Sequence, residues 1–600
     1  MSKLVKNILA LSISSALSLS FVSSANAATY QIVDQGESSK LKYTYAQRQN
    51  NNGDMAISGT NLYNFPVQFQ YLDDDDYQSI ILFALTNSWQ VTDLNDIEDS
   101  DALKAGNPTA NDLAWVIRWL QDSQFNNVNY QKVGDTVAMT NVNGVTDDYN
   151  LWDTTFEGTD ILTRSTRDIV SGITDSGISY GTATAPYLPS EVFTDSEGLE
   201  HTFWLREFGN RGFFSFDQGA QVFQVTPFET QYGGGTSAVL DVNEAGIAVG
   251  FSSYKLVQGY ADLIESDSAT NGCANPEVVP ATMTLEACIA STQLSSASDP
   301  YHTMALKATL DEGGSPVLEQ LGILVTPHVD DERTFSSYAV AINASGVAVG
   351  YADGFLDETV TAPEVNEVRA YHYAVVYKND EVIDLSGDHT DRGDSRAYDI
   401  NDDGIAVGHI TKAIGGRGVK KFFYVDTNSP EEEIEMINPD DFFSGSDSTA
   451  RAINNSGLIV GEGEIETHTE SSQNPRKTAA FVYNMNDDIF TNLNDTIPCS
   501  LRLSYDILEA RGINDAGIIS ATAVVKVERL DAKGELVLDE SGTPLTEDVV
   551  RAISLEPVPD DGEVCTAEEE EKVIRQGAST NIVSILSIMA LFGLRRRFFS

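Results

Sequence analysis

Short apolar runs with the alternation of β-strands follow one another along the chain, separated by turns rich in Asn, Asp and Gly. In one recurring ten-residue phrase, an apolar residue leads into a four-residue turn and an alternating apolar run follows it, which predicts a tight β-hairpin. The copies are "GITDSGISYG" (172–181), "DVNEAGIAVG" (241–250), "AINASGVAVG" (341–350), "DINDDGIAVG" (399–408), "AINNSGLIVG" (452–461) and "GINDAGIISA" (512–521).

The residue types inside the phrase suit a tight turn. The Asn343 side chain can accept hydrogen bonds from the backbone ahead of it, and Gly346 can adopt the positive φ that closes a hairpin with a bulge. Gly350 allows close approach or a kink in the second strand. The predicted turn glycines are Gly177, Gly246, Gly346, Gly404, Gly457 and Gly517, and "NNNGDMAISG" (50–59) adds Gly53 less cleanly.

A second phrase follows several of these hairpins and has the pattern of two further strands. Examples are "HYAVVYKNDEVIDL" (372–385) and "AAFVYNMNDDIFTNL" (479–493). Two hairpins in a unit of roughly 55 residues make four strands, the size of a propeller blade.

The two ends of the repeat region predict how the ring closes. The last unit ends at "RAISLEPVP" (551–559), its third strand, while "YQIVDQG" (30–36) resembles the fourth-strand phrase "EVIDLSG" (381–387). An N-terminal strand that completes the last blade would remove open sheet edges. We therefore predict an all-β fold, a closed β-propeller of six or seven four-stranded blades; a β-sandwich or an open array of β units is the alternative.

The region 60–165 departs from the repeat and predicts a small helical insertion. Leu113, Val116, Ile117 and Leu120 have helical spacing within 111–124, which favours a helix packed on the propeller. A second insertion, about 258–300, contains two cysteines. The run "YLDDDDYQ" (71–78) is interpreted as a solvated acidic loop.

Composition narrows the range of partners. Asp and Glu number 90 against 37 Lys and Arg, which gives a net charge of −53 and disfavours nucleic acid and anionic lipid as partners. Hydrophobic residues make up 41%, enough for a packed core.

The N-terminus has the pattern of a secretory signal peptide. Lys3 and Lys6 precede an apolar stretch, 8–22, and Ala25-Asn26-Ala27 forms a small-x-small cleavage site, so the mature chain should begin at Ala28. A first transmembrane helix is the alternative.

At the C-terminus, the apolar residues 582–594 precede Arg595, Arg596 and Arg597. As a helix, this segment would be about 20 Å long, which is shorter than the hydrocarbon core of a bilayer. Such a short segment can still reside in a membrane. Together with Gly577, Ala578 and Ser579, this tail resembles the GlyGly-type sorting signal of Gram-negative bacteria, with Ala578 in place of the second glycine. The resemblance implies transient inner-membrane anchoring, a cut near Gly577 by a rhomboid-like protease and export by type II secretion. A permanent tail anchor is the alternative.

The paired phrases also resemble the HAF-type extracellular repeat, "A-x-x-I-N-x-x-G-x-x-V-G" followed by "A-F-x-Y", which Ala480, Phe481 and Tyr483 match. With the tail, the chain resembles exported Gram-negative proteins of unknown function. The predicted organisation is a signal peptide (1–27), a propeller (28–565), an acidic linker (566–576) and a sorting segment (577–600).

Four cysteines behind a signal peptide indicate disulfides, with three possible connectivities. Cys273–Cys288 would close a local loop, and Cys499–Cys565 would join the last repeat to the acidic tail. No CxxC pair is present, so a zinc site is disfavoured.

One copy of the phrase offers a candidate metal site. Asp399, Asn401 and Asp403 match the opening of a calcium loop, but the twelfth position is Ile410 instead of a bidentate Glu. The other copies keep the asparagine and glycine without the acids, so a turn explains the shared residues. We expect no other cofactor.

No catalytic constellation is visible in the sequence. The seven histidines form no HExxH pair, and GxSxG, P-loop and GxGxxG patterns are absent. His372 and Tyr377 are interpreted as packing residues.

The sequence therefore favours an exported, non-enzymatic protein that binds an extracellular or surface polymer or protein through loops of the propeller. Aromatic-rich insertions offer candidate contact regions, with core packing as the alternative for each tryptophan: Trp89, Trp115, Trp119, Trp152 and Trp204. The other hypothesis is a secreted hydrolase acting on polysaccharide or peptide. The implied processing partners are signal peptidase, the rhomboid-like protease and the type II machinery.

Overall fold

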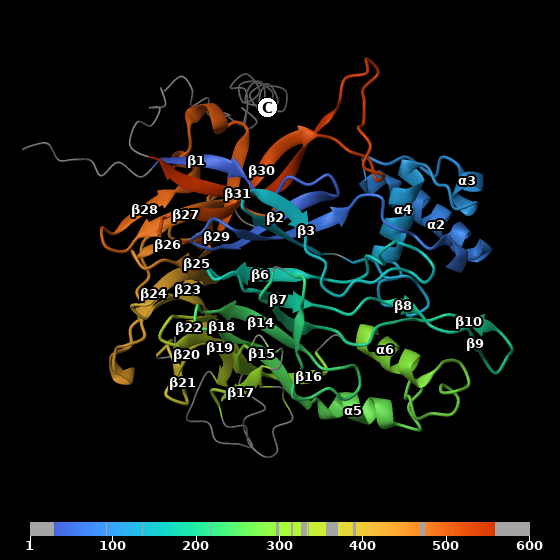
Figure 1. The fold of residues 1–600 in the computed structure, drawn as a ribbon, viewed down its shortest axis with the longest axis horizontal. Coiled ribbons are helices and arrows are strands. Elements are labelled where there is room, and N and C mark those ends of the chain that lie inside the picture. Colours follow the sequence, from blue (N-terminus) through green and yellow to red (C-terminus); the bar gives the residue numbers. More distant parts are fainter. Residues whose placement is uncertain are drawn as a thin grey trace, which may run out of the picture.

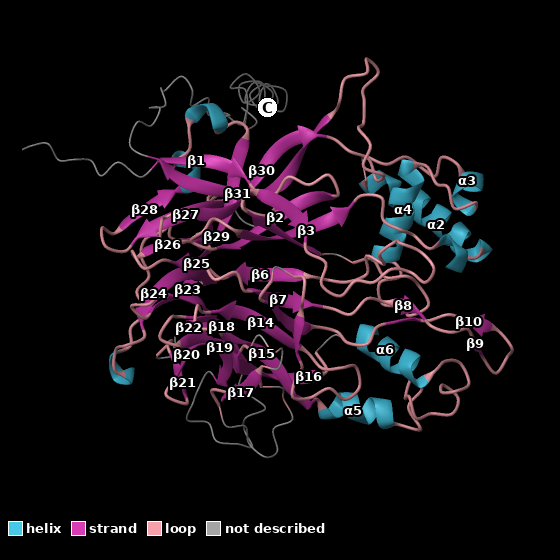
Figure 2. Cartoon of the chain, viewed as in Figure 1, coloured by secondary structure: helices cyan, strands magenta, loops and turns pink. Residues whose placement is uncertain are grey.

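The protein forms a ring of seven antiparallel blade sheets (Figure 1). The structure, a computed structural model, describes residues 29–558 apart from gaps at 92, 135, 218, 296–298, 312, 314–315, 326–332, 334, 356–369, 388–391 and 469–473. Strands dominate and the helices lie outside the ring, as Figure 2 shows. The predicted closed β-propeller with a helical insertion is confirmed, and it has seven blades.

Each blade runs from an innermost strand at the channel to an outermost strand, and the innermost strands of successive blades lie next to one another. The blades are, in order: β2 (Leu41–Gln49), β3 (Met55–Leu62), β4 (Val137–Val142), β5 (Val145–Asp148); β6 (Ile169–Ile173), β7 (Ser179–Ala183), β12 (Arg211–Ser215), β13 (Phe223–Val225); β14 (Ser237–Val242), β15 (Ile247–Leu256), β16 (Tyr301–Thr309), β17 (Val317–Gly322); β18 (Ser337–Ile342), β19 (Ala348–Phe355), β20 (Ala370–Lys378), β21 (Glu381–Asp384); β22 (Arg392–Ile400), β23 (Ile405–Ile414), β24 (Arg417–Asp426); β25 (Ser448–Ile453), β26 (Leu458–Glu464), β27 (Thr478–Asn484), β28 (Ile489–Asn492); and β29 (Tyr505–Ile513), β30 (Ile519–Glu528), β31 (Thr546–Val558), β1 (Thr29–Asp34). In blade 5 an isolated bridge between Tyr424 and Ile437 takes the fourth position.

The N-terminal strand closes the ring as the sequence predicts. β1 pairs antiparallel with β31, from Thr29 opposite Val558 to Asp34 opposite Ile553. The last blade therefore contains both ends of the described chain, and the ring has no open seam between blades 7 and 1.

The recurring phrase forms the hairpin between the first and second strands of blades 2–7. Its turn glycines all have positive φ, including Gly346 at 84°. The last glycine of the phrase has a different role: a Cβ on Gly350 would collide with the carbonyl oxygen of Tyr338 in the neighbouring strand. A register shift between Ala339 and Ala341 brings the two strands this close.

In every blade except blade 2, an asparagine in the first hairpin joins its own turn to the next blade. In blade 4 the Oδ1 of Asn343 accepts the Val347 amide at 3.0 Å, and its Nδ2 donates to the carbonyl of Asn401 at 3.2 Å. Equivalent amide donors lie 3.0–3.3 Å from the next carbonyl around the ring, and the donors are Asn50, Asn243, Asn343, Asn401, Asn454 and Asn514. Blade 2 has Thr174 at this position, so the belt is interrupted between blades 2 and 3.

A second belt runs through the residues that follow these asparagines. The backbone amide of Asp402 donates to Asn455 Oδ1 at 2.9 Å, and the amide of Asn455 donates to Asp515 Oδ1 at 3.1 Å. The same bond recurs between other blades, but Ala344 has no side-chain acceptor for the amide of Glu244. The two belts make the hairpin tips one continuous hydrogen-bonded face, which we call the turn face.

The long insertions that the structure describes between second and third strands leave the opposite face, which we call the insertion face. Strand direction dictates this, because connections between second and third strands lie at the other end of the blade from the phrase. The insertions contain α2 (Asp74–Asn87), α3 (Ser100–Lys104) and α4 (Ala110–Asp122) in blade 1; β8 (Leu188–Pro189), β9 (Phe193–Thr194), β10 (Glu200–His201) and β11 (Trp204–Leu205) in blade 2; α5 (Gln258–Glu265) and α6 (Leu285–Ser295) in blade 3; and 529–545 in blade 7. Figure 1 shows α2–α6 gathered on one side of the blades.

The helix expected at 111–124 is α4, and it buries Leu113, Val116 and Leu120. The interpretation of 71–78 as a solvated loop is wrong. Asp73 caps the N-terminus of α2 by accepting the amides of Asp75 and Asp76, and the following aspartates form its first turn. Carboxylates are favourable there because they meet unpaired amides and the positive end of the helix dipole.

A disulfide joins Cys273 and Cys288 in the blade 3 insertion, the local pairing that the sequence favours. Cys499 is also disulfide-bonded, and its predicted partner Cys565 lies outside the described residues. The predicted cleavage site at Ala27 and Ala28 and the sorting segment from Gly577 lie outside them too. Among the described residues, no helix is long and apolar enough to cross a membrane.

Because Asn454 makes two separate interactions in the belt, different substitutions there should lower the free energy of unfolding by different amounts. Asn454→Thr keeps a turn acceptor, as Thr174 does in blade 2, but loses the interblade donor, and should lower the free energy of unfolding by about 1 kcal/mol. Asn454→Ala loses both interactions and should cost about 2–3 kcal/mol. Urea unfolding of the two variants measures the difference; equal losses would contradict a separate interblade contribution.

Candidate functional site

The channel mouth on the turn face is lined by the ends of the innermost strands and has a cavity volume of about 280 Å³. Each innermost strand has a residue two positions before its belt asparagine, or before Thr174 in blade 2, and five of these seven residues line the channel mouth. The position is small in four blades and charged in three, and the set is Arg48, Gly172, Asp241, Ala341, Asp399, Ala452 and Gly512, of which Gly172 and Ala341 do not line the mouth.

The three charged residues meet across the channel. Arg48 Nη1 lies 2.7 Å from Asp241 Oδ1, and Arg48 Nη2 lies 3.4 Å from Asp399 Oδ1. The remaining oxygens are used as well: Asp241 Oδ2 accepts the amide of Ile342, and Asp399 Oδ2 accepts that of Ile453, each at 2.9 Å. Arg48 thus links carboxylates that are each hydrogen-bonded to the following blade.

Burial controls the protonation of this cluster. Burial raises the pKa of Asp399 to about 6, although Arg48 opposes the shift. Tyr180 donates its hydroxyl to Asp241 Oδ1 at 2.9 Å, and burial raises the pKa of Tyr180 as well. The carboxylates are held by fixed partners, which is the arrangement of a structural ion pair and not of a free acid–base pair.

The residues of the candidate calcium loop do not converge. Asp399 contacts Arg48, Asn401 belongs to the belt, and Asp403 is exposed with its carbonyl accepting from Asn428. Calcium would have to displace the partners of the first two residues. Among the described residues, no group of three or more His, Cys, Asp and Glu is arranged to hold a metal. Calcium binding therefore stays an untested prediction.

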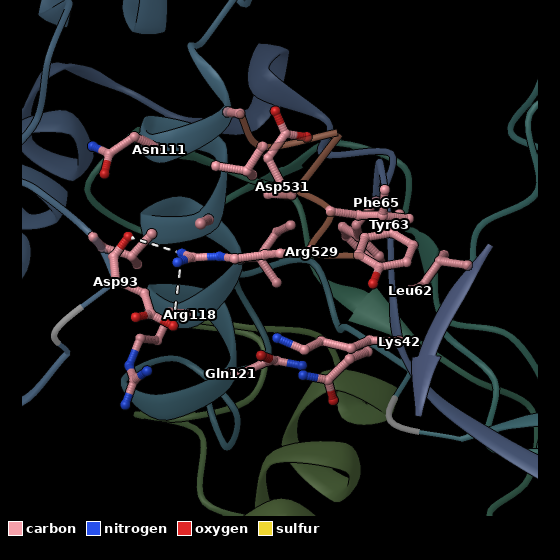
Figure 3. Close-up of a pocket in the computed structure, with 18 of the residues that line it drawn as sticks. Lys42, Leu62, Tyr63, Phe65, Asp93, Asn111, Arg118, Gln121, Arg529 and Asp531 are labelled. Atoms are coloured by element: carbon pink, nitrogen blue, oxygen red, sulfur yellow. Dashed lines mark hydrogen bonds and ion pairs between the residues drawn. The ribbon is translucent and has the colours of Figure 1, made fainter. Parts of the chain in front are cut away.

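A larger cavity of about 530 Å³ lies on the insertion face, between α4, blade 1 and the 529–545 hairpin of blade 7 (Figure 3). Arg529 extends across it, with Nη2 at 3.7 Å from Asp93 Oδ2. Lys42 pairs with Glu547 at 2.7 Å, and burial raises the pKa of Tyr63 to about 12. Asn111, Arg118 and Gln121 of α4 complete a wall with mixed donors and acceptors.

Local sequence explains the walls of this cavity. Asp112 of α4 is buried and accepts the amides of Glu98 and Asp99 at 2.8 and 3.0 Å, which holds the 93–99 loop against the helix. In the hairpin, Asp531 accepts two amides ahead of it, and Gly534 supplies positive φ. The walls are therefore fixed by hydrogen bonds before any ligand is present.

The tryptophans divide between core and surface. Trp115, Trp119 and Trp204 are fully buried, so core packing holds for them and direct contact with a ligand does not. Trp89 is 77% exposed, and Trp152 lines a separate cavity of about 310 Å³ on the insertion face.

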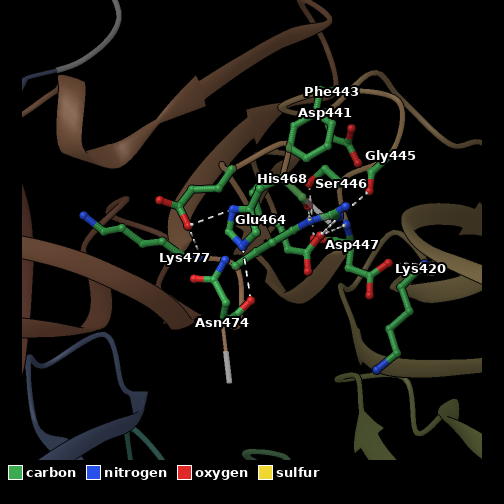
Figure 4. Close-up of polar contacts among 12 residues, drawn as sticks. Lys420, Asp441, Phe443, Gly445, Ser446, Asp447, Glu464, His468, Asn474 and Lys477 are labelled. Atoms are coloured by element: carbon green, nitrogen blue, oxygen red, sulfur yellow. Dashed lines mark hydrogen bonds and ion pairs between the residues drawn. The ribbon is translucent and has the colours of Figure 1, made fainter. Parts of the chain in front are cut away.

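Buried ion pairs fasten the insertion-face loops of blades 5 and 6. Figure 4 labels several residues of these loops, among them Asp441, Ser446 and Glu464. Lys421 Nζ lies 2.7 Å from Asp441 Oδ2 and also donates to the Ser446 carbonyl. Arg476 Nη1 lies 2.6 Å from Glu464 Oε2, and both side chains are less than 10% exposed. These charges hold loops together and are not available to a ligand.

A third ionisable cluster lies between blades 4 and 5. The His372 ring bridges Asp353, at 3.3 Å, and Asp394, at 3.1 Å. Burial disfavours the charged Asp394, but His372, His409 and Arg396 outweigh it and lower the pKa of Asp394 well below its usual range. His372 is therefore part of an ion network, whereas Tyr377 is buried in the core as the sequence predicts.

Sequence reasoning missed Arg48, Asp241 and the Tyr180 contact. The sequence does contain a signal for these residues. Arg48 and Asp241 stand two positions before the belt asparagine, where four blades have Gly or Ala. The cavity at α4 had no such signal, since its walls come from blades 1 and 7.

These features define a seven-bladed β-propeller that closes its turn face with structural bonds and encloses cavities on its insertion face. The chain belongs to the family described as "Protein of unknown function (DUF3466)", whose model matches residues 5–597. No curated protein matches it. Among solved structures it is similar to a Trypanosoma rangeli sialidase in complex with the inhibitor DANA, at 8% identity and a TM-score of 0.27. That match covers 69% of this chain and 56% of the sialidase chain, and a likeness at this level says nothing about activity.

Removing the channel arginine should destabilise the ring. Arg48→Met leaves two carboxylates without their cation, and we expect the free energy of unfolding to fall by about 3 kcal/mol at pH 7. The triple variant with Asp241→Asn and Asp399→Asn should recover part of that loss. Urea unfolding of both variants tests this, and an Arg48→Met protein as stable as the wild type would contradict it.

The raised pKa of Asp399 predicts a pH dependence of stability. The native carboxyl keeps its proton up to about pH 6, whereas the ordinary value is 3.8. The native state therefore binds the proton more strongly, so wild-type stability should rise relative to Asp399→Asn as pH falls from 7 to 4, by about 2 kcal/mol. Parallel unfolding curves measure the difference, and a constant difference across this range would refute the shift.

Proposed function

We propose that this protein is an exported, non-enzymatic binding protein that holds an extracellular or surface polymer or protein on its insertion face. The observation that carries the proposal is the placement of the long insertions between second and third strands in blades 1, 2, 3 and 7, which leave one face and enclose cavities of about 530 and 310 Å³ there. Preformed cavities with a few convergent polar groups are typical ligand sites.

The two faces differ in how they use their polar side chains, and this difference supports the proposal. The turn face uses its side chains in the two belts and in the Arg48 cluster. Loops on a rigid scaffold commonly carry binding residues, and the insertion face supplies such loops. The 529–545 hairpin also joins blade 7 to blade 1, because the Asn64 amide donates to the Ala532 carbonyl at 2.7 Å.

The proposed route of export rests on the two ends of the chain, as the resemblances to a sorting tail and to HAF-type repeats imply. Signal peptidase would cut after Ala27, a rhomboid-like protease near Gly577, and type II secretion would deliver the body to the cell surface or medium. We propose that the protein requires no cofactor. Calcium binding is the alternative to be tested.

A secreted hydrolase is the second candidate function. The observation that favours it is His372 between two carboxylates, because such groups can transfer protons. His372→Ala would then abolish hydrolysis of polysaccharides or peptides by the purified protein. Absence of hydrolysis by the wild type across both substrate classes would leave the binding function.

The blade 7 hairpin offers a direct test of the binding function. Glu528 and Thr546 are paired in register, as Ile414 and Arg417 are in blade 5, where only Gly415 and Gly416 connect the strands. Replacing 529–545 with Gly-Gly should remove one wall of the larger cavity while leaving the blade intact.

The measurement is binding of the full chain to a panel of extracellular polysaccharides and surface proteins by biolayer interferometry. We expect the hairpin replacement to weaken the strongest interaction at least tenfold, and Ala344→Asn on the turn face to leave it within twofold. Loss of binding in the Ala344→Asn control with none in the hairpin variant would overturn the assignment of the face.

A further inference from the structure

The cavity at Trp152 has an unusual combination of aromatic walls and cations. The rings of Trp152 and Phe208 meet edge to face, with centroids 5.4 Å apart and planes at 86°, so they form a corner. Arg206, Glu207 and Gln224 also line the cavity, which opens on the insertion face of blade 2. An apolar corner beside hydrogen-bonding side chains suits a ring-shaped ligand with one apolar face.

Two guanidinium groups at this corner have no carboxylate partner. Arg206 lies over the Tyr187 ring, with Cζ at 4.9 Å from the centroid, and Arg211 lies at the same distance over Phe208. Among the described residues, neither arginine forms an ion pair or a side-chain hydrogen bond. Arg211 is 8% exposed, and its Nε and Nη1 are buried without a hydrogen-bond partner.

An unpaired buried cation is costly, and this chain has many means to avoid it. With 90 acidic residues for 37 Lys and Arg, a carboxylate partner is easily supplied, as Arg476 shows with Glu464. Burial lowers the pKa of Arg211, and Glu207 opposes this only from beyond ion-pair distance. A guanidinium does not lose its proton in proteins, so the positive charge remains and needs an anion.

We propose that the Trp152–Phe208 corner binds a pyranose ring that carries a carboxylate, as in a polymer of uronic acid. The apolar face of the sugar packs on Trp152, and Arg206 forms a bidentate pair with the carboxylate. Arg211 lies behind Phe208 and adds positive potential. This inference rests on the proposed function, because it names the polymer class for the same face.

The protein has a large net negative charge, so it attracts only the one carboxylate of the ligand that lies close to the arginines. At physiological salt, charges beyond about 8 Å are largely screened. Within that range Arg206 lines the cavity, Arg211 lies behind Phe208, and the carboxylate of Glu207 opposes them. The remaining acidic surface repels a polyanion, which makes affinity depend strongly on the two arginines.

The test compares charged and neutral forms of the same sugars. Trimers of galacturonate and of glucuronate, and their methyl esters, are titrated into the full chain by calorimetry. We expect one acid trimer to bind at least tenfold more tightly than its ester. Arg206→Gln should lose this preference, Arg206→Lys should retain part of it, and Trp152→Leu should weaken acid and ester alike. Lys526→Gln, which removes an exposed charge paired with Asp548, should stay within twofold of wild type.

Three results would overturn the proposal: acid and ester trimers that bind equally, an Arg206→Gln protein with full preference for the acid, or no binding of either acid trimer. The hairpin replacement in blade 7 leaves this corner intact. If that replacement abolishes binding of another polymer while the trimers fail to bind, the binding function stands and the uronate assignment is wrong.

Discussion

The amide side chains at the hairpin tips are the interaction on which the ring depends. Each asparagine shapes its own turn through Oδ1 and reaches the next blade through Nδ2, so one residue serves both local and long-range structure. This double use explains why the phrase recurs with so little change. A turn alone would accept Asp, Ser or Gly at this position. An amide has its acceptor and its donor on separate atoms, so it can accept from the turn and reach the carbonyl of the next blade at the same time.

The repeat, the hairpins, the closing strand and α4 could be predicted because each depends on residues close in sequence or on a visible pattern. The interactions between blades could not, since Asn343 and Asn401 meet only when the ring curves. The same limit applies to Arg48, whose partners Asp241 and Asp399 lie in blades 3 and 5. The acidic run at Asp73–Asp76 was misjudged because charge suggested a loop, whereas capping of a helix N-terminus decided the outcome.

The arrangement of bonds also separates stability from binding. The turn face uses its polar groups internally, and its channel mouth is crossed by Arg48 and its two carboxylates. The insertion face has its own buried ion pairs around Lys421 and Arg476. It also retains cavities and two arginines, Arg206 and Arg211, that form no ion pair with any residue that the structure describes. The residues at the loops can therefore differ without loss of the belts and the Arg48 cluster that join the blades on the turn face. Because propellers support many functions, this placement of sites says more about function here than the fold does.

Residue-resolved amide hydrogen exchange tests the central claim, that the hairpin tips are joined into belts, most directly. Tips of ordinary exposed hairpins exchange quickly, because their amides bond to water. We predict slow exchange for the amides of Asp402, Asn455 and Asp515, which donate to the next blade. We predict faster exchange for the amide of Glu244, because its neighbour Ala344 has no side-chain acceptor. Equal, rapid exchange at all four amides would show that the tips are independent turns and that no belt joins them.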